Sequence, residues 1–357
     1  MITNNNPVII ALDAMSGDLG SEAIVPAALK ALQLYPNLSL ILVGDQTVVT
    51  EYLRKHQGIN YPRLTIVHAS QIVAMDERPS IALRNKKDSS MRVAINLVKE
   101  GKAHACVSSG NTGALMAIAK FVLKTLPGID RPAIMAKFPS MKKNAQVRVL
   151  DLGANVDSTP QHLVQFAVMG SVVAKAVGNI PDPTIGLLNV GSEEIKGNQQ
   201  VQETASILEN YQGLHYIGFV EGDDLFKATA DVIVCDGFVG NVMLKTAEGL
   251  LRMLLKYLKT AFSQNWLTKL LAILLLPFFK KLNKGFNPSK YNGASLLGLN
   301  GIVVKSHGSA NQYSFLNAIG EAVEEVERNV PELIREELAL LLSSNPNLPL
   351  KSEDNES

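Results

Sequence analysis

The sequence predicts a three-layer α/β/α fold with a mostly parallel sheet, and three observations support this prediction. Seven short runs of aliphatic and β-branched residues each end in Gly, Asp, Asn or Ser. The runs do not alternate between apolar and polar residues, which is typical of strands buried on both faces. Helical stretches such as residues 22–35 and 198–211 lie between the runs. Because strand and helix alternate, the strands are expected to be parallel.

Each predicted strand leads directly into a polar loop. In chain order the segments are VIIALDAMSGD (8–18), LSLILVGD (38–45), HACVSSGNTG (104–113), VRVLDLGANVD (147–157), TIGLLNVGSEE (184–194), VIVCDGFVGN (232–241) and GIVVKSHGSA (301–310). In parallel sheets ligands bind at the carboxyl ends of the strands, so we expect these loops to converge on one crevice. Turn and helix-cap chemistry also explains any one loop alone. Seven such loops together predict a ligand site.

Composition indicates a single large globular unit. The chain has 357 residues, 46% hydrophobic content and a net charge of +1. We expect one catalytic α/β domain over residues 1–345 and a disordered polar tail over 346–357. The near-neutral charge argues against nucleic acid as a partner. The two cysteines, Cys106 and Cys235, form no disulfide or zinc pattern, and no export signal is seen, so we expect a cytoplasmic protein without a metal.

An apolar run, LLAILLLPFF at residues 270–279, follows a long helical pattern over residues 241–262. A helix that crosses a bilayer needs about 20 apolar residues, so this run is too short to do so. The two segments predict a helical hairpin, inserted at about residues 241–292, that projects from the α/β body. The run is either buried, in the protein core or in an interface with another subunit, or it lies on a membrane surface.

Familiar nucleotide, zinc-protease and serine-hydrolase motifs are absent, but one segment suits an anion. SSGNTGAL, residues 108–115, places two glycines around Asn111 and Thr112 at the expected start of a helix. Backbone amides and the helix dipole favour negative charge at such a position. This segment therefore predicts a phosphate-like ligand held without a nucleotide signature.

Two further loops carry candidate groups for polarising a carbonyl. GSEEIKGN, residues 191–198, places Lys196 directly before Gly197, where an ammonium can act as an electrophile. DGFVGN supplies Asn241, whose amide is able to donate to an oxyanion. Alternatively, Lys196 is a solvated surface lysine and Asn241 caps the following helix.

Taken together, these motifs, in order from ALDAMSGD to KSHGS, resemble the phosphate acyltransferases of bacterial phospholipid synthesis, the PlsX family, over about residues 8–330. The resemblance implies the fold of isopropylmalate dehydrogenase-like proteins and phosphotransacylases. It also implies a reaction in which inorganic phosphate attacks the thioester of a fatty acyl chain on acyl carrier protein. The products are an acyl phosphate and the free carrier thiol. This chemistry requires no cofactor and no metal, which agrees with the missing motifs.

The resemblance also assigns roles to residues. Lys196 and Asn241 become the groups that polarise the carbonyl, and His307 either shuttles a proton or is a hydrogen-bonded structural histidine. The residues expected to bind substrate are Asp13, Gly17, Asp18, Ser108, Gly110, Asn111, Thr112, Gly191 and Gly197. Ser16 and Ser109 depart from the family pattern, which has glycine and alanine there.

Further partners follow from the same resemblance. It implies a homodimer. The apolar hairpin near residues 266–284, with Trp266 and lysines beside its apolar residues, has in addition the composition of a peripheral membrane anchor. At the membrane the downstream glycerol-phosphate acyltransferase would receive the product. Two alternatives stay open: a phosphotransacylase that uses short-chain acyl-CoA, and a catalytically inactive membrane-associated scaffold.

Overall fold

The computed structural model describes residues 7–58, 60–142, 145–211, 213–275, 277–278 and 288–344. Over these ranges eleven strands form one sheet in the order β3-β2-β1-β4-β11-β10-β5-β6-β9-β7-β8. The strands are β1 (Val8–Asp13), β2 (Leu38–Gly44), β3 (Leu64–His68), β4 (Ala105–Ser108), β5 (Ala133–Pro139), β6 (Gln146–Leu150), β7 (Thr184–Leu188), β8 (His215–Val220), β9 (Val232–Val234), β10 (Ala294–Leu297) and β11 (Ile302–Lys305).

Helices occupy most of the connections between these strands. They are α1 (Ser21–Leu34), α2 (Gln46–Lys55), α3 (Pro79–Asn85), α4 (Ser90–Lys99), α5 (Thr112–Leu123), α6 (Pro160–Ala176), α7 (Gln199–Glu209), α8 (Asp224–Lys227), α9 (Gly237–Ser263), α10 (Trp266–Leu274), the 3-10 helix η1 (Pro288–Tyr291), α12 (Gln312–Glu327) and α13 (Val330–Ser344). The seven strands expected from the sequence are β1, β2, β4, β6, β7, β9 and β11, and all of them are present.

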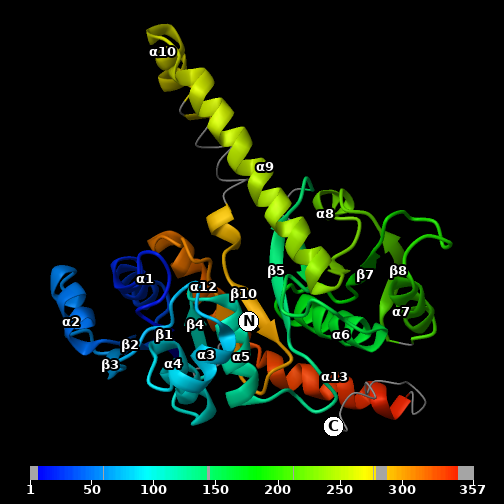
Figure 1. The fold of residues 1–357 in the computed structure, drawn as a ribbon, viewed down its shortest axis with the longest axis horizontal. Coiled ribbons are helices and arrows are strands. Elements are labelled where there is room, and N and C mark those ends of the chain that lie inside the picture. Colours follow the sequence, from blue (N-terminus) through cyan, green and yellow to red (C-terminus); the bar gives the residue numbers. More distant parts are fainter. Residues whose placement is uncertain are drawn as a thin grey trace.

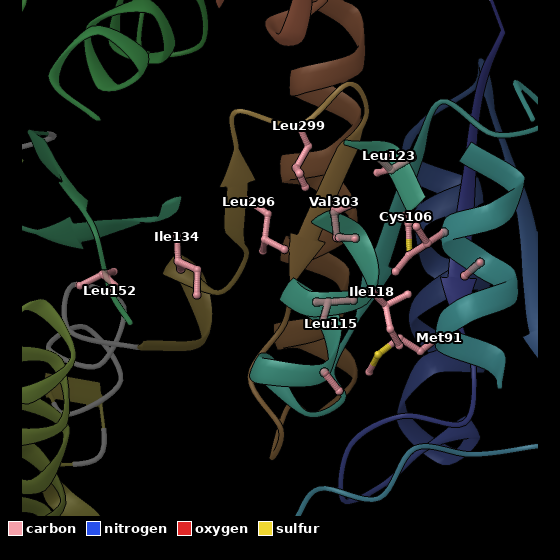
Figure 2. Packing of buried hydrophobic residues seen from close by; sticks show 14 of the residues in the cluster. Met91, Cys106, Leu115, Ile118, Leu123, Ile134, Leu152, Leu296, Leu299 and Val303 are labelled. Carbon is pink, nitrogen blue, oxygen red and sulfur yellow. The ribbon is translucent and has the colours of Figure 1, made fainter. Parts of the chain in front are cut away.

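Helices cover both faces of the sheet. Successive residues of a strand point to opposite sides, so each strand packs against helices on both faces. In β1, Ala11 packs in the cluster of α4 and α5, shown in Figure 2, whereas Ile10 and Leu12 pack against α1 and α12. In β5, Ile134 belongs to the first of these faces and Met135 packs against α6 on the other. The predicted three-layer α/β/α architecture with a mostly parallel sheet is therefore confirmed.

The sheet consists of two parallel blocks that run in opposite directions. Strands β3, β2, β1, β4 and β11 are parallel to one another, and so are β6, β9, β7 and β8. Between the blocks, β10 is antiparallel to β11 and to β5, and β5 is antiparallel to β6. The carboxyl ends of the two blocks therefore point in opposite directions along the sheet, and the polar loops fall into two groups.

The predicted helical hairpin projects from the body, with α10 packed at the far end of the long helix α9 (Figure 1). Asn265 begins α10 by accepting a hydrogen bond from the backbone N–H of Thr268 at 2.9 Å. The side chains of Ile273 and Leu274 are 62% and 68% exposed, so the described part of the apolar run is not buried in the core of its own chain. Leu276 and residues 279–287 lie outside the described residues, as do residues 345–357, which include the expected tail. Among the described helices, none is long and apolar enough to span a bilayer.

Candidate active site

Three neighbouring parallel strands end together and form a polar cradle, made of the loops that follow Asp13 in β1, Ser108 in β4 and Lys305 in β11. Lys305 and Ser108 are direct partners in the strand register. The Ser108 hydroxyl donates a hydrogen bond of 2.7 Å to Oδ2 of Asp13. The end of one parallel block therefore brings together three of the polar loops that the sequence singled out.

Glycine allows these loops to approach through their backbones. Gly17 has φ of +78°, and a Cβ atom there would lie 2.6 Å from Oγ of Ser109 and 2.8 Å from the carbonyl oxygen of Gly308. A side chain at position 17 would therefore push the loops apart. The next residue, Asp18, donates its backbone N–H to the same Gly308 carbonyl at 2.8 Å. The first and third loops are thus held in direct contact.

The two serines that depart from the family pattern contact each other inside this cradle. Ser16 and Ser109 are both buried, and their hydroxyl oxygens lie 3.0 Å apart. Ser109 donates its backbone N–H to Oγ of Ser16 at 3.0 Å, and its own hydroxyl donates to the Ser16 carbonyl at 2.9 Å. Because φ at Ser16 is not positive, serine carries no backbone penalty there. The two departures form one hydrogen-bonded pair.

We expect the serine pair to be energetically coupled. Ser16→Gly alone removes the acceptor of a buried N–H, and Ser109→Ala alone removes a buried partner of Ser16, whereas the double variant restores the family residues at both positions. Direct partners commonly show coupling free energies of roughly 0.5–3 kcal/mol. Urea denaturation of the wild type, the two single variants and the double variant measures this value. Strictly additive changes in the free energy of unfolding would contradict the coupling.

Lys305 is a cation that the sequence reasoning overlooked, although it stands in the KSHGS motif. The residue is only 9% exposed, and its ammonium donates to the carbonyl oxygen of Ser306. Burial, and then repulsion by Lys245, lowers the pKa of Lys305 to about 8, while Asp13 partly opposes this shift. Burial also raises the pKa of the Asp13 carboxyl. The available signal in the sequence was a lysine that directly follows the apolar run IVV of a predicted strand.

His307 stands at the rim of the cradle with a defined ring orientation. Its Nδ1 atom accepts the backbone N–H of Ser309 at 3.2 Å and lies 2.8 Å from the Ser309 hydroxyl. A neutral ring that accepts at Nδ1 carries its proton on Nε2, and Nε2 lies 3.8 Å from Oε1 of Glu248 on α9. Burial is the main cause that lowers the pKa of His307, with Glu248 opposing it and Lys305 adding to it. The ring is therefore neutral at pH 7 and able to donate from Nε2.

The second group of polar loops surrounds the start of α9. Asp151, directly after β6, is buried and accepts the backbone N–H groups of Ile134, Ala154 and Asn155 at 2.8 to 3.0 Å. Gly240 in α9 lies so close that a Cβ there would be 1.8 Å from the carbonyl oxygen of Asp151. The helix therefore begins in backbone contact with the loop after β6.

Asn241 is not the cap of this helix, which was the alternative to its proposed role. Asp236 is the cap, and it accepts the backbone N–H of Val239 at 2.9 Å. Asn241 is exposed and lies beside Gly153. A Cβ atom added to Gly153 would lie 3.3 Å from Cβ of Asn241. Glu248 lies two helical turns further along α9, a rise of about 10 Å. Helix α9 thus connects the Asn241 position to the rim of the cradle.

Among the described residues, no hydrogen bond or ion pair joins the loop after β7 to either group. Lys196 is 45% exposed, and its ammonium forms an ion pair of 2.7 Å with Glu193. Gly191 packs against the stem of Lys196, and Gly197 has φ of +104° next to the side chain of Asn189. The structure therefore places Lys196, Gly191 and Gly197 on their own exposed loop.

In the predicted phosphate loop, Asn111 has a structural role, whereas Gly110 contacts the cradle residue Ser108. Asn111 caps α5 by accepting the backbone N–H of Ala114 at 2.9 Å, and its amide donates to the Met75 carbonyl at 2.7 Å. Gly110 donates its N–H to Oγ of Ser108 at 3.1 Å, whereas Thr112 is exposed at the first position of the helix. Over the described ranges no group of three or more His, Cys, Asp and Glu side chains is arranged as a metal site.

The cradle suits a small anion, because a buried lysine and the N-terminus of α5 lie at one end of the sheet. The fold and this site define the class of protein: an α/β protein with the phosphotransacylase architecture. The chain is similar in structure to a phosphotransacetylase from Streptococcus pyogenes, with a TM-score of 0.62 at 21% identity over 90% of this chain and 94% of the other. It is also similar to a branched-chain phosphotransacylase from Enterococcus faecalis V583, with a TM-score of 0.55 at 15% identity over 89% and 99% of the two chains.

Sequence comparison gives the particular family. The model of the family described as "Fatty acid synthesis protein" matches residues 8–333, and the chain belongs to this family. It is 58% identical to a phosphate acyltransferase from Legionella pneumophila (strain Paris), over 93% of this chain and 96% of the relative. It is 57% identical to a phosphate acyltransferase from Coxiella burnetii (strain RSA 493 / Nine Mile phase I), over 95% and 98%. The family predicted from the sequence is confirmed, and with it an acyltransferase as the class of enzyme.

Proposed function

We propose that the protein transfers a fatty acyl group from acyl carrier protein to inorganic phosphate, as a step of bacterial phospholipid synthesis. The observation that carries the proposal is the buried cation Lys305, placed among the serine and glycine loops that end β1, β4 and β11. Inorganic phosphate lies in this cradle, with the Lys305 ammonium as its counter-charge. Asp13 then orients Ser108 and Lys305 and does not contact the anion directly.

The chemical step joins the cradle to the start of α9. A phosphate oxygen attacks the thioester carbonyl carbon, a C–O bond forms, and the C–S bond breaks to release the carrier as a thiolate. The amide of Asn241 and the ammonium of Lys196 donate to the carbonyl oxygen as charge develops on it. The proton that the attacking hydrogen phosphate loses passes to the thiolate. The His307 ring relays it, taking up this proton at one ring nitrogen while it releases the Nε2 proton, so the ring ends neutral. Both donors reach one carbonyl oxygen only if the loop that carries Lys196 moves toward the start of α9.

One assay tests the reaction and its alternatives together. Radiolabelled phosphate is supplied with either acyl-[acyl carrier protein] or short-chain acyl-CoA, and hydroxylamine-sensitive acyl phosphate is measured. We expect efficient labelling with the long-chain carrier substrate. Preference for short-chain acyl-CoA would identify a phosphotransacylase of the other type, and no labelling with either donor would indicate an inactive scaffold.

The hairpin supports a proposal about location. Helix α10 has no buried residue among those described, and apolar side chains are exposed along both helices, including Leu254, Trp266, Leu270 and Ile273. We infer that one part of this surface packs in a homodimer and that the tip lies on the cytoplasmic face of a membrane. There the amphiphilic acyl phosphate passes to the membrane glycerol-phosphate acyltransferase.

We expect the variant Ile273→Glu/Leu274→Glu to lose sedimentation with anionic liposomes while soluble acyl transfer stays unchanged. Both side chains are well exposed, so charges there are tolerated by the fold but not by lipid. Each apolar side chain placed in lipid contributes roughly 1.5–3 kcal/mol, so two losses suffice to abolish reversible binding. Leu34→Glu, at an exposed position on α1, is the matched control. Conversion of the dimer to monomers would instead assign these residues to the protein interface.

A further inference from the structure

A cavity of about 330 Å³ lies on the face of the sheet that carries α6 and α12, separate from the cradle. Arg148 in β6 points to this face, because its neighbours Val147 and Val149 pack in the cluster on the opposite face. The side chains that define the chemistry of the cavity are Tyr35, Lys137, Gln146, Arg148, Lys290, Tyr291, Asn292, Asn317, Glu321 and Glu324.

Arg148 is a buried charge that lacks a direct partner. The residue is 3% exposed, its Nε atom has no hydrogen-bond partner, and no ion pair joins it to another described residue within 4 Å. The carboxylates that act on Arg148 electrostatically are those of Glu321, Asp231 and Glu324. Two of them are engaged by another cation, since Lys137 lies 2.5 Å from Glu321 and 3.7 Å from Glu324. A guanidinium stays charged at any physiological pH, and an unpaired buried charge is costly. An anion in the cavity would remove this cost.

The side chains that line the cavity carry a positive excess. Three lining cations, Lys137, Arg148 and Lys290, face two lining carboxylates, those of Glu321 and Glu324. A third carboxylate, that of Asp231, acts on Arg148 from outside the lining, where it accepts hydrogen bonds from Thr184. Behind them, burial and the neighbouring Glu321 raise the pKa of Glu325 to about 8, so this side chain is uncharged at neutral pH. A guanidinium matches the paired oxygens of a phosphate or carboxylate. The electrostatics therefore select an anion.

The size and lining of the cavity narrow the choice further. The volume is about ten times that occupied by one water molecule in the liquid, which leaves room for more than a bare phosphate ion. Two tyrosine hydroxyls and the amides of Gln146 and Asn317 are available to hydroxyl groups of a ligand. An acyl chain would find few apolar partners here. A phosphate group on a small polar alcohol or sugar fits all of these features.

We propose that this cavity binds a phosphomonoester of a small polar alcohol or sugar, with the phosphate on Arg148 and Lys137. The site adjoins the cradle through one residue, Asn292, which lines the cavity. The side chain of Asn292 accepts the backbone N–H of His307 at 2.9 Å and donates to the Ser306 hydroxyl at 2.8 Å. A ligand in the cavity therefore touches the residue that holds the His307 loop, which makes it a regulator of the cradle.

Binding is tested on the full-length protein by calorimetric titration and thermal unfolding. The probes are glucose 6-phosphate and adenosine monophosphate, with glucose and adenosine as their unphosphorylated controls and citrate as a carboxylate. We expect at least one phosphomonoester to bind and to raise Tm, while its parent alcohol does neither. Arg148→Met and Lys290→Met should each weaken this binding at least tenfold. Lys99→Met, at an exposed lysine at the end of α4, should leave it unchanged.

Two further measurements separate this site from the cradle and from a structural role of Arg148. Lys305→Met should lose stabilisation by inorganic phosphate yet keep that by the phosphomonoester. Without ligand, Arg148→Met should raise Tm, because it removes an unpaired buried charge, whereas an arginine needed by the fold would lower it. The proposal is overturned if no phosphomonoester binds, if citrate alone binds, or if binding persists in both the Arg148→Met and Lys290→Met variants. A lower Tm of ligand-free Arg148→Met would overturn it as well.

Discussion

Lys305→Met is expected to lower kcat/KM for inorganic phosphate by roughly 10²- to 10³-fold, the usual cost of losing a buried donor to a developing or bound anion. The ammonium is the only cation that the three strand ends of the cradle supply among the described residues, so its loss removes the counter-charge that these strands offer to a bound phosphate. The substitution keeps a similar volume and removes a strained buried charge. The fold should therefore stay intact, with Tm unchanged or raised.

The pKa of Lys305 gives this prediction a second readout. Because burial lowers the pKa to about 8, the ammonium that binds phosphate is present below pH 8 and is lost above it. We expect kcat/KM for phosphate to fall as the pH rises through 8 in the wild type. Lys305→Arg, if active, should lack this fall, since a guanidinium does not titrate there.

The control for the Lys305 experiments is Lys102→Met, an exposed lysine paired with Glu100 before the start of β4. It should change neither the rate nor the pH profile. If Lys305→Met kept a near-normal kcat/KM for inorganic phosphate, the phosphate would have to bind at another part of the molecule.

Lys196→Ala is expected to lower kcat by roughly 10²-fold or more without changing KM for phosphate, because the donor acts mainly in the transition state. Lys196 is exposed and paired only with Glu193 among the described residues, so truncation should leave Tm unchanged. Asn241→Ala should have a similar but smaller effect on kcat. Lys227→Ala removes another exposed, ion-paired lysine and is the matched control.

The same experiment decides whether the loop after β7 belongs to the site. No hydrogen bond or ion pair joins Lys196 to the cradle or to the described residues around Asn241, so its role depends on movement of its loop. Turnover by Lys196→Ala within a few-fold of the wild type, measured as acyl phosphate formed, would make Lys196 a solvated surface lysine. Asn241 would then be the remaining candidate for polarising the carbonyl.

Local patterns in the sequence determined much of this fold. Unbroken aliphatic runs predicted the central strands because a strand covered on both faces has no polar side. The long pattern before the apolar run predicted α9, whose observed bounds, Gly237–Ser263, extend the expected 241–262 by a few residues. The half-exposed edge strands β3 and β8 and the central β5 and β10 were missed. Exposure on one side weakens the apolar signal of β3 and β8.

The cradle could be predicted in part, because local sequence patterns also mark the ends of strands. Gly17, Gly110 and Ser108 stand at strand ends, where chemistry and turn geometry both select such residues, so their sequence positions alone pointed to a site. The residue type at position 305 did not reveal its role, because a lysine in a motif reads as an exposed charge. Only the packing of β11 between β4 and β10 buries it and lowers its pKa.

Tertiary structure alone decided how the loops are grouped. Two antiparallel strands, β10 and β5, lie between the parallel blocks and reverse their direction, and no local pattern encodes that pairing because it joins residues far apart in the chain. The contact between Ser16 and Ser109 and the isolation of Arg148 arise in the same way. Each depends on which distant side chain occupies the neighbouring space, and therefore on long-range packing rather than on the propensity of any segment.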